Sequence, residues 1–481
     1  MLSLILRKEG KAMRYSALCC VVLTALTLGA GLVTVAYQTA EPQELVDPPM
    51  EQARHLLIDG AETDCRHQPV AVTHYTPDDP ASSRPVLGWS RIDGAVMYDV
   101  QVVKRHGGGP SACYEPVMAA QRVYNTACEL LLPAGCREPV LYWRVKPLNL
   151  RGQAIGPFSE LEPLPVDWQK QDVVKPVPLS TYNQGRGQTL LYPVYDWIAM
   201  SDADHYEVEI LDAPPENPNG IEPSAHRIAV YTTPIAHQYD GQARMSAQPF
   251  YWRVRAVRSD GSPLGVYSDA SSYTTDPSRP CAAAIYGDSI SHGGGSVSYS
   301  PADWEFSYGH YLAFPTVNLS FSGDTSRTAV ERFDKDVAPF HPPYLLILMG
   351  TNSLRAGVEP AEVIADMEQV KAKCLAYGIR PVFLTLPPLN PANIRAAFGQ
   401  DTVRSWREAM AEVNAYVKTQ VHVDITPGMA DEQGELREDL AVDGLHLDPP
   451  GKRLMAEAIN AAWPDITALP DEAWNADDPS Y

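Results

Sequence analysis

Apolar residues follow two different patterns along this chain, and the change falls near residue 281. Beyond that point, continuous apolar runs such as "YLLILMG" alternate with stretches in which apolar residues recur at helical spacing. Apolar strands separated by helices are typical of a parallel sheet covered on both faces. We therefore predict a three-layer α/β/α domain over residues 281–469, with a five-stranded parallel sheet in the flavodoxin-like order 2-1-3-4-5. The expected strands are 282–287, 315–321, 344–350, 380–386 and 421–426, and the expected helices are 325–338, 359–377, 401–419 and 450–463.

Before residue 281, polar and apolar residues alternate, and the pattern occurs twice. The corresponding segments are "LGWSRIDGAVMYDVQV" (87–102) with "YDWIAMSDADHYEVEI" (195–210), and "YWRVKPLNLRGQAIGPFSE" (142–160) with "YWRVRAVRSDGSPLGVYSD" (251–269). A period of two indicates half-buried strands, and the long repeat is the size of a domain. We expect two all-β sandwich domains, at 81–165 and 175–277, that resemble fibronectin type III domains and have tryptophans such as Trp89 and Trp197 as core anchors.

The N-terminal segment contains an uncharged stretch from Tyr15 to Tyr37 that follows a basic cluster. Such a stretch is long enough to span a ~30 Å hydrocarbon core, and the basic residues favour an inward N-terminus. A cleavable signal peptide usually has a shorter apolar region, of ~7–15 residues. We expect residues 1–40 to insert in a membrane as an anchor, or to be cleaved as a signal peptide. Residues 41–80 are then a linker, and the remaining chain is extracytoplasmic, ending in an acidic tail at 470–481.

The charge of the chain bears on its binding partners, and the cysteine positions bear on disulfide formation. The chain has 481 residues and a formal net charge of −21 at pH 7, which argues against a nucleic-acid partner because phosphates are bound by clusters of basic residues. Cys113, Cys128 and Cys136 are close enough in sequence for a local disulfide, with Cys65 as a further partner, and buried free thiols are the alternative. Cys374 falls on the apolar face of an expected helix, which predicts a core position.

Short polar motifs follow the first three expected strands of the α/β domain. They are "GDS" (287–289), "SGD" (322–324) and "GTN" (350–352). Ligands of open parallel sheets bind beyond the carboxyl ends of the strands, near the point where the strand order reverses. In the order 2-1-3-4-5 these three strands are neighbours, so the three loops converge. Near the C-terminus, "DGLHLDPPG" contributes Asp443 and His446.

These residue types are the ones that acyl transfer needs. A serine hydroxyl is a poor nucleophile until an imidazole takes its proton, and the imidazole needs a carboxylate to orient it. The oxyanion that develops on the carbonyl needs fixed hydrogen-bond donors. Ser289 offers a hydroxyl and its backbone N–H, Gly323 a backbone N–H that no side chain obstructs, and Asn352 a side-chain amide.

The chain resembles the SGNH/GDSL hydrolases over roughly residues 281–465. Four blocks, "GDSI", "NLSFSGDTS", "LMGTNS" and "DGLHLD", occur in the order that this family has. One block alone is a weak signal, whereas four in order are specific. The resemblance implies that Ser289 is the nucleophile, that His446 is the general base and that Asp443 orients it.

The same resemblance implies an oxyanion hole formed by Ser289, Gly323 and Asn352, and a reaction that uses no metal or organic cofactor. One residue departs from the family pattern. Many members have aspartate after the asparagine of the third block, and this chain has Ser353. That difference affects how Asn352 is positioned but removes none of the implied catalytic groups.

Other interpretations of these loops are weaker. "HGGG", at 106–109 and 292–295, resembles an oxyanion motif of another esterase fold, but that fold needs a Gly-x-Ser-x-Gly elbow that this chain lacks. We expect 106–109 to be a loop of the first β domain and 292–295 to be a flexible wall of the active cleft. No lysine follows the glycines, which argues against a phosphate-binding loop. Asp288 and Asp324 are expected to stabilise their own turns, and His292 lacks the partner carboxylate that a general base needs.

The leading functional prediction is an exported serine esterase that hydrolyses a small acyl ester, first of all an acetyl ester, of a small molecule or a polysaccharide. A lysophospholipase or thioesterase would differ in the size of its acyl pocket. An O-acyltransferase would pass the same acyl group to a sugar hydroxyl instead of water. In a different class, a non-catalytic surface protein would bind glycans through its β domains and would need none of the implied catalytic residues. The simplest role for the β domains is that of spacers.

Overall fold

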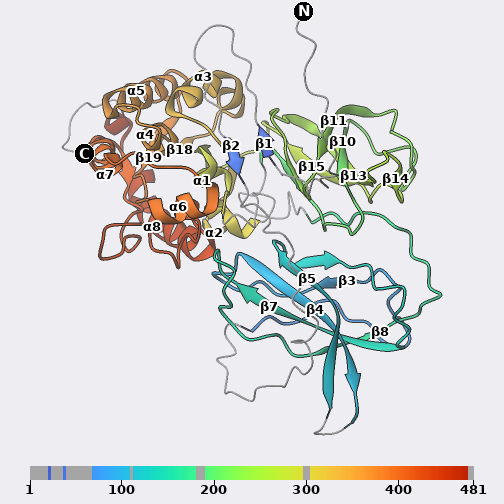
Figure 1. The fold of residues 1–481 in the computed structure, drawn as a ribbon. Helices are drawn as coiled ribbons and strands as arrows, with labels where there is room; N and C mark the ends of the chain where they lie inside the picture. Colours follow the sequence, from blue (N-terminus) through green and yellow to red (C-terminus); the bar gives the residue numbers. More distant parts are fainter. Residues whose placement is uncertain are drawn as a thin grey trace, which may run out of the picture.

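Two β-rich bodies and one α/β body follow one another along the chain (Figure 1). The computed structural model describes residues 20–22, 36–38, 68–108, 112–179, 190–295 and 304–474. β1 (Cys20–Val22) and β2 (Ala36–Gln38) form a short antiparallel pair, and the rest of the predicted N-terminal anchor lies outside the described residues. None of the helices within these ranges has the length and apolar character needed to cross a membrane.

The first β body has one small and one larger antiparallel sheet. Its strands are β3 (Val86–Gly88), β4 (Met97–His106), β5 (Cys113–Val123), β6 (Ala127–Glu129), β7 (Val140–Leu148) and β8 (Glu162–Pro165). β3 pairs with β6, and the larger sheet has the order β5-β4-β7-β8. Alternation along β4 and β7 buries Tyr98 and Trp143, which form one apolar cluster with Trp89, the residue after β3.

The second β body repeats this plan. Its strands are β9 (Val194–Asp196), β10 (His205–Leu211), β11 (Arg227–Thr233), β12 (His237–Tyr239), β13 (Ser246–Val257), β14 (Pro263–Leu264) and β15 (Ser271–Thr275). β9 pairs with β12, and the larger sheet has the order β11-β10-β13-β14, with β15 also on β13. The small-and-large pair of sheets therefore recurs in both copies of the sequence repeat.

Matching side-chain contacts show that the repeat is structural. The ring of Trp89 meets that of Tyr98 edge-on at 5.4 Å, and the ring of Trp197 meets that of Tyr206 edge-on at 5.1 Å. In each body the tyrosine hydroxyl also accepts a hydrogen bond from the backbone N–H six residues earlier, at 3.0 and 2.8 Å. The predicted tryptophan cores are confirmed, while fibronectin type III identity stays a prediction.

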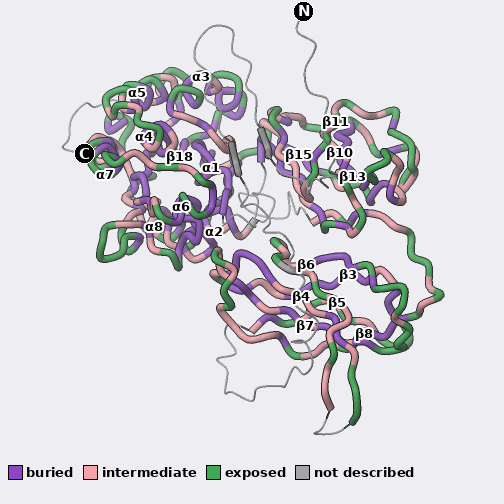
Figure 2. The backbone as a smooth tube through the Cα atoms, in the orientation of Figure 1, coloured by how far each residue is buried: buried purple, intermediate pink, exposed green. Residues whose placement is uncertain are grey.

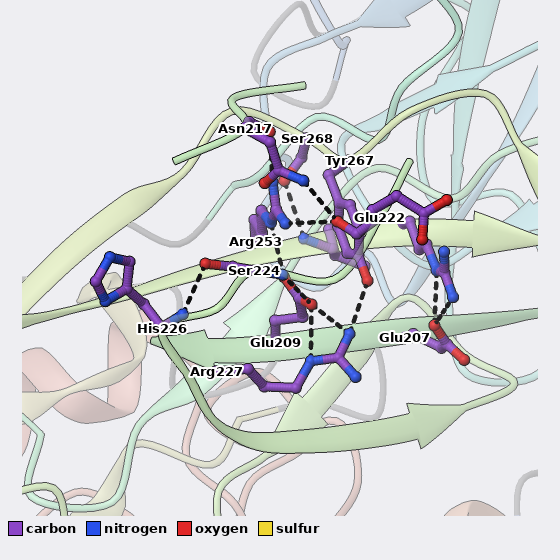
Figure 3. Close-up of polar contacts among 12 residues, drawn as sticks. Glu207, Glu209, Asn217, Glu222, Ser224, His226, Arg227, Arg253, Tyr267 and Ser268 are labelled. Carbon is purple, nitrogen blue, oxygen red and sulfur yellow. Dashed lines mark hydrogen bonds and ion pairs between the residues drawn. The ribbon is translucent and has the colours of Figure 1, made fainter. Parts of the chain in front are cut away.

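A buried ion cluster fixes one loop of the second β body (Figure 3). The Glu209 carboxylate on β10 is fully buried and accepts hydrogen bonds from Arg253 Nε and Arg227 Nε, both at 2.7 Å. Arg253 also donates to the backbone carbonyls of Asn217 and Glu222, at 3.0 and 3.1 Å. Because a buried charge is tolerated only when it is paired and hydrogen-bonded, this cluster ties the loop between β10 and β11 to the sheet.

The cysteines of the β region are free thiols in the structure. Cys113, Cys128 and Cys136 form no disulfide with one another, and Cys65 lies outside the described residues. Burial raises the pKa of the Cys128 thiol to about 12. Cys374 is fully buried in the α/β core, as its place on an apolar helix face predicts.

The α/β body contains the predicted sheet. Its strands are β16 (Ala283–Gly287), β17 (Thr316–Asn318), β18 (Tyr344–Leu348), β19 (Arg380–Leu384) and β20 (His422–Val423). All neighbours are parallel, and the order β17-β16-β18-β19-β20 is the predicted 2-1-3-4-5. β16 is buried along its whole length, and Figure 2 shows the central strands in the buried colour. Helices on both faces explain why these strands are continuously apolar.

The helices of this body agree with the predicted pattern and add short segments at the sheet edge. They are α1 (Ser289–His292), α2 (Tyr308–Tyr311), α3 (Ser326–Asp336), α4 (Thr351–Arg355), α5 (Pro360–Ala376), α6 (Pro391–Phe398), α7 (Trp406–Val417) and α8 (Pro449–Thr467), with 3-10 turns at Trp304–Phe306, Ala338–Phe340 and Asp471–Trp474. The expected acidic tail at 470–481 begins inside the domain, because the Trp474 side chain is buried in the core against Tyr344.

Both β bodies contact the α/β body. Val96, Met97 and Leu148 of the first form a buried cluster with Val442. In the second, the Leu191 N–H donates to the Asn318 carbonyl at 2.9 Å, so the chain before β9 extends the sheet beyond its edge strand β17. Both β bodies are therefore packed against the α/β body, and their role as spacers stays a prediction.

Candidate active site

The predicted nucleophile lies where β16 turns into α1. The Asp288 carboxylate accepts a hydrogen bond from the Ile290 N–H at 2.9 Å and caps α1, which confirms its structural role. A side chain at Gly287 would clash, because its Cβ would lie 2.0 Å from the Leu348 carbonyl oxygen on β18. This close approach of backbones places Ser289 at the carboxyl edge of the sheet, where the predicted loops meet.

Ser289, His446 and Asp443 form one chain of hydrogen bonds. Ser289 Oγ lies 2.8 Å from His446 Nε2, and His446 Nδ1 lies 2.8 Å from Asp443 Oδ2. A carboxylate only accepts, so Nδ1 carries a proton and Nε2 presents its lone pair to the serine hydroxyl. The sequence predicts these three residues from motif blocks, and the first and last blocks are more than 150 positions apart. In the structure the three residues are in contact.

The Asp443 carboxylate is held by its own turn. It is fully buried, and its Oδ1 accepts the backbone N–H groups of Leu445 and His446, at 2.8 and 2.7 Å. Both oxygens are therefore occupied, one by the backbone and the other by the imidazole. The Phe398 ring meets the His446 ring edge-on at 5.8 Å and limits its rotation.

The glycine run after α1 packs against the catalytic groups. A Cβ at Gly294 would lie 3.0 Å from His446 Cδ2 and 3.4 Å from Ser289 Cβ, and one at Gly295 would overlap the Phe306 ring. Residues 292–295 are all buried. The expected flexible wall is instead a closely packed segment, because only glycine allows the chain to pass this near the imidazole.

Three candidate oxyanion donors face the same edge. Gly323 has φ +92°, a conformation that favours glycine, and nothing lies within 4 Å of where its Cβ would be. Asn352 Nδ2 donates one hydrogen to the Asp324 carbonyl at 2.9 Å, which orients the amide and leaves its second hydrogen for a ligand. Among the described residues, none accepts a hydrogen bond from the N–H of Ser289 or Gly323.

A buried arginine that sequence reasoning missed connects these loops. Arg332 of α3 forms an ion pair with Asp324 and donates to the carbonyls of Leu319 and Gly287, at 2.6 and 3.2 Å. It therefore ties the end of β16 to the loop that carries Gly323. Burial raises the pKa of Asp324 although Arg332 opposes the rise, and the predicted loop-stabilising role of Asp324 is confirmed.

The departure at Ser353 has a local partner. Its Oγ accepts a hydrogen bond from the Ser326 N–H at 3.0 Å, at the start of α3. Ser326 Oγ in turn donates to the Asp366 carboxylate of α5 at 2.8 Å. A neutral hydroxyl fits here because Asp366 already supplies a carboxylate to this helix start.

Lys452 is a second buried cation that the sequence analysis left out. It lies in the first turn of α8, and its Nζ donates to the Ile290 carbonyl directly after the nucleophile. Burial lowers its pKa to about 7 and raises that of Asp288 to about 6. Lys452 shares the buried face of the helix with Met455 and Ala456. A lysine at this spacing from apolar residues was the only sign in the sequence that its side chain is buried.

A serine, an imidazole and a carboxylate form a hydrogen-bonded chain at the carboxyl edge of a parallel sheet. This fold and this site define an α/β serine hydrolase. Residues 285–454 match the model of the GDSL-like lipase/acylhydrolase family. This domain therefore belongs to that family and is a serine ester hydrolase domain, which confirms the resemblance drawn from the four blocks. Within the described ranges, no group of His, Cys, Asp and Glu side chains is arranged to bind a metal ion.

Several known proteins are similar to a part of this chain, and each covers less than half of it. Esterase TesA of Pseudomonas aeruginosa is 25% identical over 158 residues, which are 32% of this chain and 71% of TesA. The crystal structure of a GDSL-like lipase from Bacteroides thetaiotaomicron has 19% identity and a TM-score of 0.32, and covers 38% of this chain and 87% of its own. A lipase/acylhydrolase from Enterococcus faecalis has 19% identity and a TM-score of 0.30, with 37% and 93% covered.

Proposed function

We propose that the chain is an exported serine esterase that hydrolyses small acyl esters through a covalent acyl-enzyme. The observation that carries this proposal is the hydrogen-bonded chain from Ser289 Oγ through His446 to Asp443, with both distances at 2.8 Å. Each atom in it has the protonation that nucleophilic attack requires. The family match to residues 285–454 supports an ester as the bond that is cleaved.

In the first half of the reaction, Ser289 Oγ attacks the ester carbonyl carbon while its proton moves to His446 Nε2. Asp443 stabilises the imidazolium that forms, because its carboxylate is already hydrogen-bonded to Nδ1. The carbonyl oxygen becomes an oxyanion that accepts hydrogen bonds from the Ser289 and Gly323 N–H groups and from Asn352 Nδ2. Collapse of this intermediate breaks the ester C–O bond, and His446 gives its proton to the leaving alcohol.

In the second half, water attacks the acyl-serine. His446 Nε2 takes a proton from the water, the same three donors stabilise the second oxyanion, and Ser289 leaves with the proton returned by His446. The products are a carboxylic acid and the regenerated serine.

A small acyl group, first of all acetyl, suits the confined reacting atoms. Ser289 and His446 are only 5% and 6% exposed, and the Gly294 backbone lies against both residues. We propose a carbohydrate as the alcohol, since the first β body packs on Val442, directly before Asp443, and can present a second surface beside the cleft. The apolar stretch from Tyr15 to Tyr37 supports export, either as a membrane anchor or as a signal peptide.

The direct test is hydrolysis of p-nitrophenyl acetate by the full chain and by Ser289→Ala. Ser291→Ala is a matched control, because Ser291 is a fully buried serine of the same helix whose Oγ lies 3.5 Å from the Tyr308 hydroxyl. We expect saturable turnover that is lost in Ser289→Ala and retained in Ser291→Ala. Equal rates in wild type and Ser289→Ala would contradict the proposal.

A further inference from the structure

His292 joins the second β body to the loop that carries Gly323. Its Nε2 lies 2.8 Å from the Tyr192 backbone carbonyl, and its Nδ1 lies 2.8 Å from Ser322 Oγ. A carbonyl only accepts, so Nε2 carries the proton, and Nδ1 must accept from the Ser322 hydroxyl. The neutral imidazole thus forms one donor bond and one acceptor bond, and burial favours this neutral form by lowering the pKa to about 4.

Tyr192 is held on the α/β body at several points. Its side chain belongs to the apolar core of that body and its ring meets Phe321 at 4.5 Å. Its hydroxyl donates to Asp336 at 2.6 Å, and Asp336 pairs with Arg332 at 3.2 Å. The residue before it, Leu191, is hydrogen-bonded to the edge strand β17.

The nucleophile helix is drawn into the same junction. Asn318, at the end of β17, donates through Nδ2 to the carbonyls of Ser291 and His292, at 2.9 and 3.2 Å. Its own carbonyl accepts the Leu191 N–H. The second β body therefore contacts, through one fully buried asparagine and one buried histidine, both α1 and the Ser322–Gly323 turn.

We propose that His292 and Tyr192 are positioning residues for the oxyanion hole, and that catalysis depends on docking of the second β body through them. This inference rests on the proposed function, because it takes the Gly323 N–H as an oxyanion donor. Gly323 has an open side, with nothing within 4 Å of its Cβ direction, so its own packing does not fix it there. Ser322, the neighbouring residue, is fixed by His292.

The cost of losing this support follows from how strictly donors must be placed. Removing one oxyanion donor typically costs ~10²–10³-fold in kcat, and a ~1 Å misplacement can cost ~10²-fold. When the loop keeps the Gly323 donor but loses its anchor, the loss of kcat should be at the lower end of this range. We therefore expect about a 10-fold to 100-fold loss of kcat, with little change in KM, since the substrate ground state carries no oxyanion.

Two variants separate the two bonds of the imidazole. In His292→Asn the amide oxygen replaces Nδ1 and keeps the Ser322 bond, while the bond to Tyr192 is lost. In His292→Gln the amide nitrogen reaches toward the Tyr192 carbonyl, while the acceptor for Ser322 is lost. We expect both variants to lose kcat, because the link needs both ends. A trifluoromethyl ketone, which forms a tetrahedral serine adduct, should lose affinity in parallel with kcat.

Tyr195→Phe is the matched control for a general loss of stability. Tyr195 is a fully buried tyrosine of the same β body, and its hydroxyl donates to Asp240 at 2.8 Å. Its removal should lower the unfolding temperature of the full chain but leave kcat unchanged. Tyr192→Phe removes the bond to Asp336 and should lower kcat, while the backbone carbonyl still accepts from His292.

The outcomes distinguish this inference from the proposed function. Loss of kcat and of inhibitor affinity in both His292 variants, with normal KM and a normal Tyr195→Phe, supports the positioning role. If Ser289→Ala is inactive while His292→Asn and His292→Gln turn over like wild type, only this inference is overturned. If Ser289→Ala has the wild-type rate, the proposed function is overturned and the inference with it.

Discussion

Replacement of Asp443 by asparagine tests the tautomer that the site geometry requires. Oδ1 of Asp443 accepts two backbone N–H groups, from Leu445 and His446. An asparagine at this position keeps both bonds only if its amide oxygen takes the place of Oδ1. Its NH₂ group must then face His446 Nδ1, which lies 2.8 Å from Oδ2 in the native chain.

An NH₂ group can only donate, so Nδ1 must become the acceptor and the imidazole proton must move to Nε2. Nε2 then faces Ser289 Oγ with a hydrogen instead of a lone pair and cannot take the serine proton. The same change in a serine protease lowers kcat about 10⁴-fold, which corresponds to about 5.5 kcal/mol at 1.36 kcal/mol per factor of ten.

The assay is the steady-state hydrolysis of p-nitrophenyl acetate by the full chain, with Asp443→Ala beside Asp443→Asn. Alanine removes the carboxylate but leaves the imidazole free to adopt either tautomer, so we expect Asp443→Asn to be at least as inactive as Asp443→Ala. Unchanged far-UV circular dichroism would exclude unfolding as the cause. An Asp443→Asn variant with more than a tenth of the wild-type kcat would refute this reasoning.

Three further changes test separate parts of the structure. Gly294→Ala places a Cβ 3.0 Å from the His446 ring and should lower kcat at least ~10-fold with small change in thermal stability; a normal kcat would contradict the close packing. Glu209→Ala leaves Arg253 buried without its carboxylate and should lower the urea-derived unfolding free energy of the second β body by ~3–5 kcal/mol, and a loss below ~1 kcal/mol would contradict the buried ion cluster. Burial lowers the pKa of His292 from 6.5 to about 4. As the pH falls through this window, the unfolded chain therefore binds a proton at this histidine before the native chain does. The free energy of unfolding should then fall by up to ~3 kcal/mol between pH 6.5 and 4. His292→Gln should remove that share of the acid sensitivity, and an unchanged pH profile of stability would contradict it.

Local pattern and strand order were enough to predict the sheet and the residues at its carboxyl edge. Continuous apolar strands can be read directly from the sequence, and the order 2-1-3-4-5 brings the loops after β16, β17 and β18 together. The pairing of Ser289 with His446 was implied by the family resemblance of the four blocks, since the block that carries His446 lies before α8 and not at a strand end. The last strand was harder, since β20 forms only two residues, His422–Val423, of the expected 421–426.

Long-range contacts without a local signature could not be predicted. Tyr192 and His292 are 100 positions apart, and nothing in either neighbourhood specifies the other. Arg332 looks like an ordinary charged position of an amphipathic helix, although its guanidinium joins the end of β16 to the loop after β17. Lys452 was different, because a lysine on the apolar side of α8 was visible in the sequence.

The tight packing of residues 292–295 was also beyond the sequence. Consecutive glycines usually indicate a flexible loop, since they add conformational freedom. Here a Cβ at Gly294 would crowd His446 and one at Gly295 would overlap Phe306, so the glycines are required by contact. Cysteine spacing was equally ambiguous, and Cys113, Cys128 and Cys136 are free thiols.

The measurement that tests the central claim most directly is the location of the acyl group during turnover. The full chain is mixed with p-nitrophenyl acetate, quenched in acid within the first turnover and digested, and the peptides are examined by mass spectrometry. We predict an acetyl group on Ser289 that appears at the rate of p-nitrophenol release and is absent in Ser289→Ala. Turnover without an acetylated Ser289 peptide, or with the acetyl group on another residue, would contradict the account.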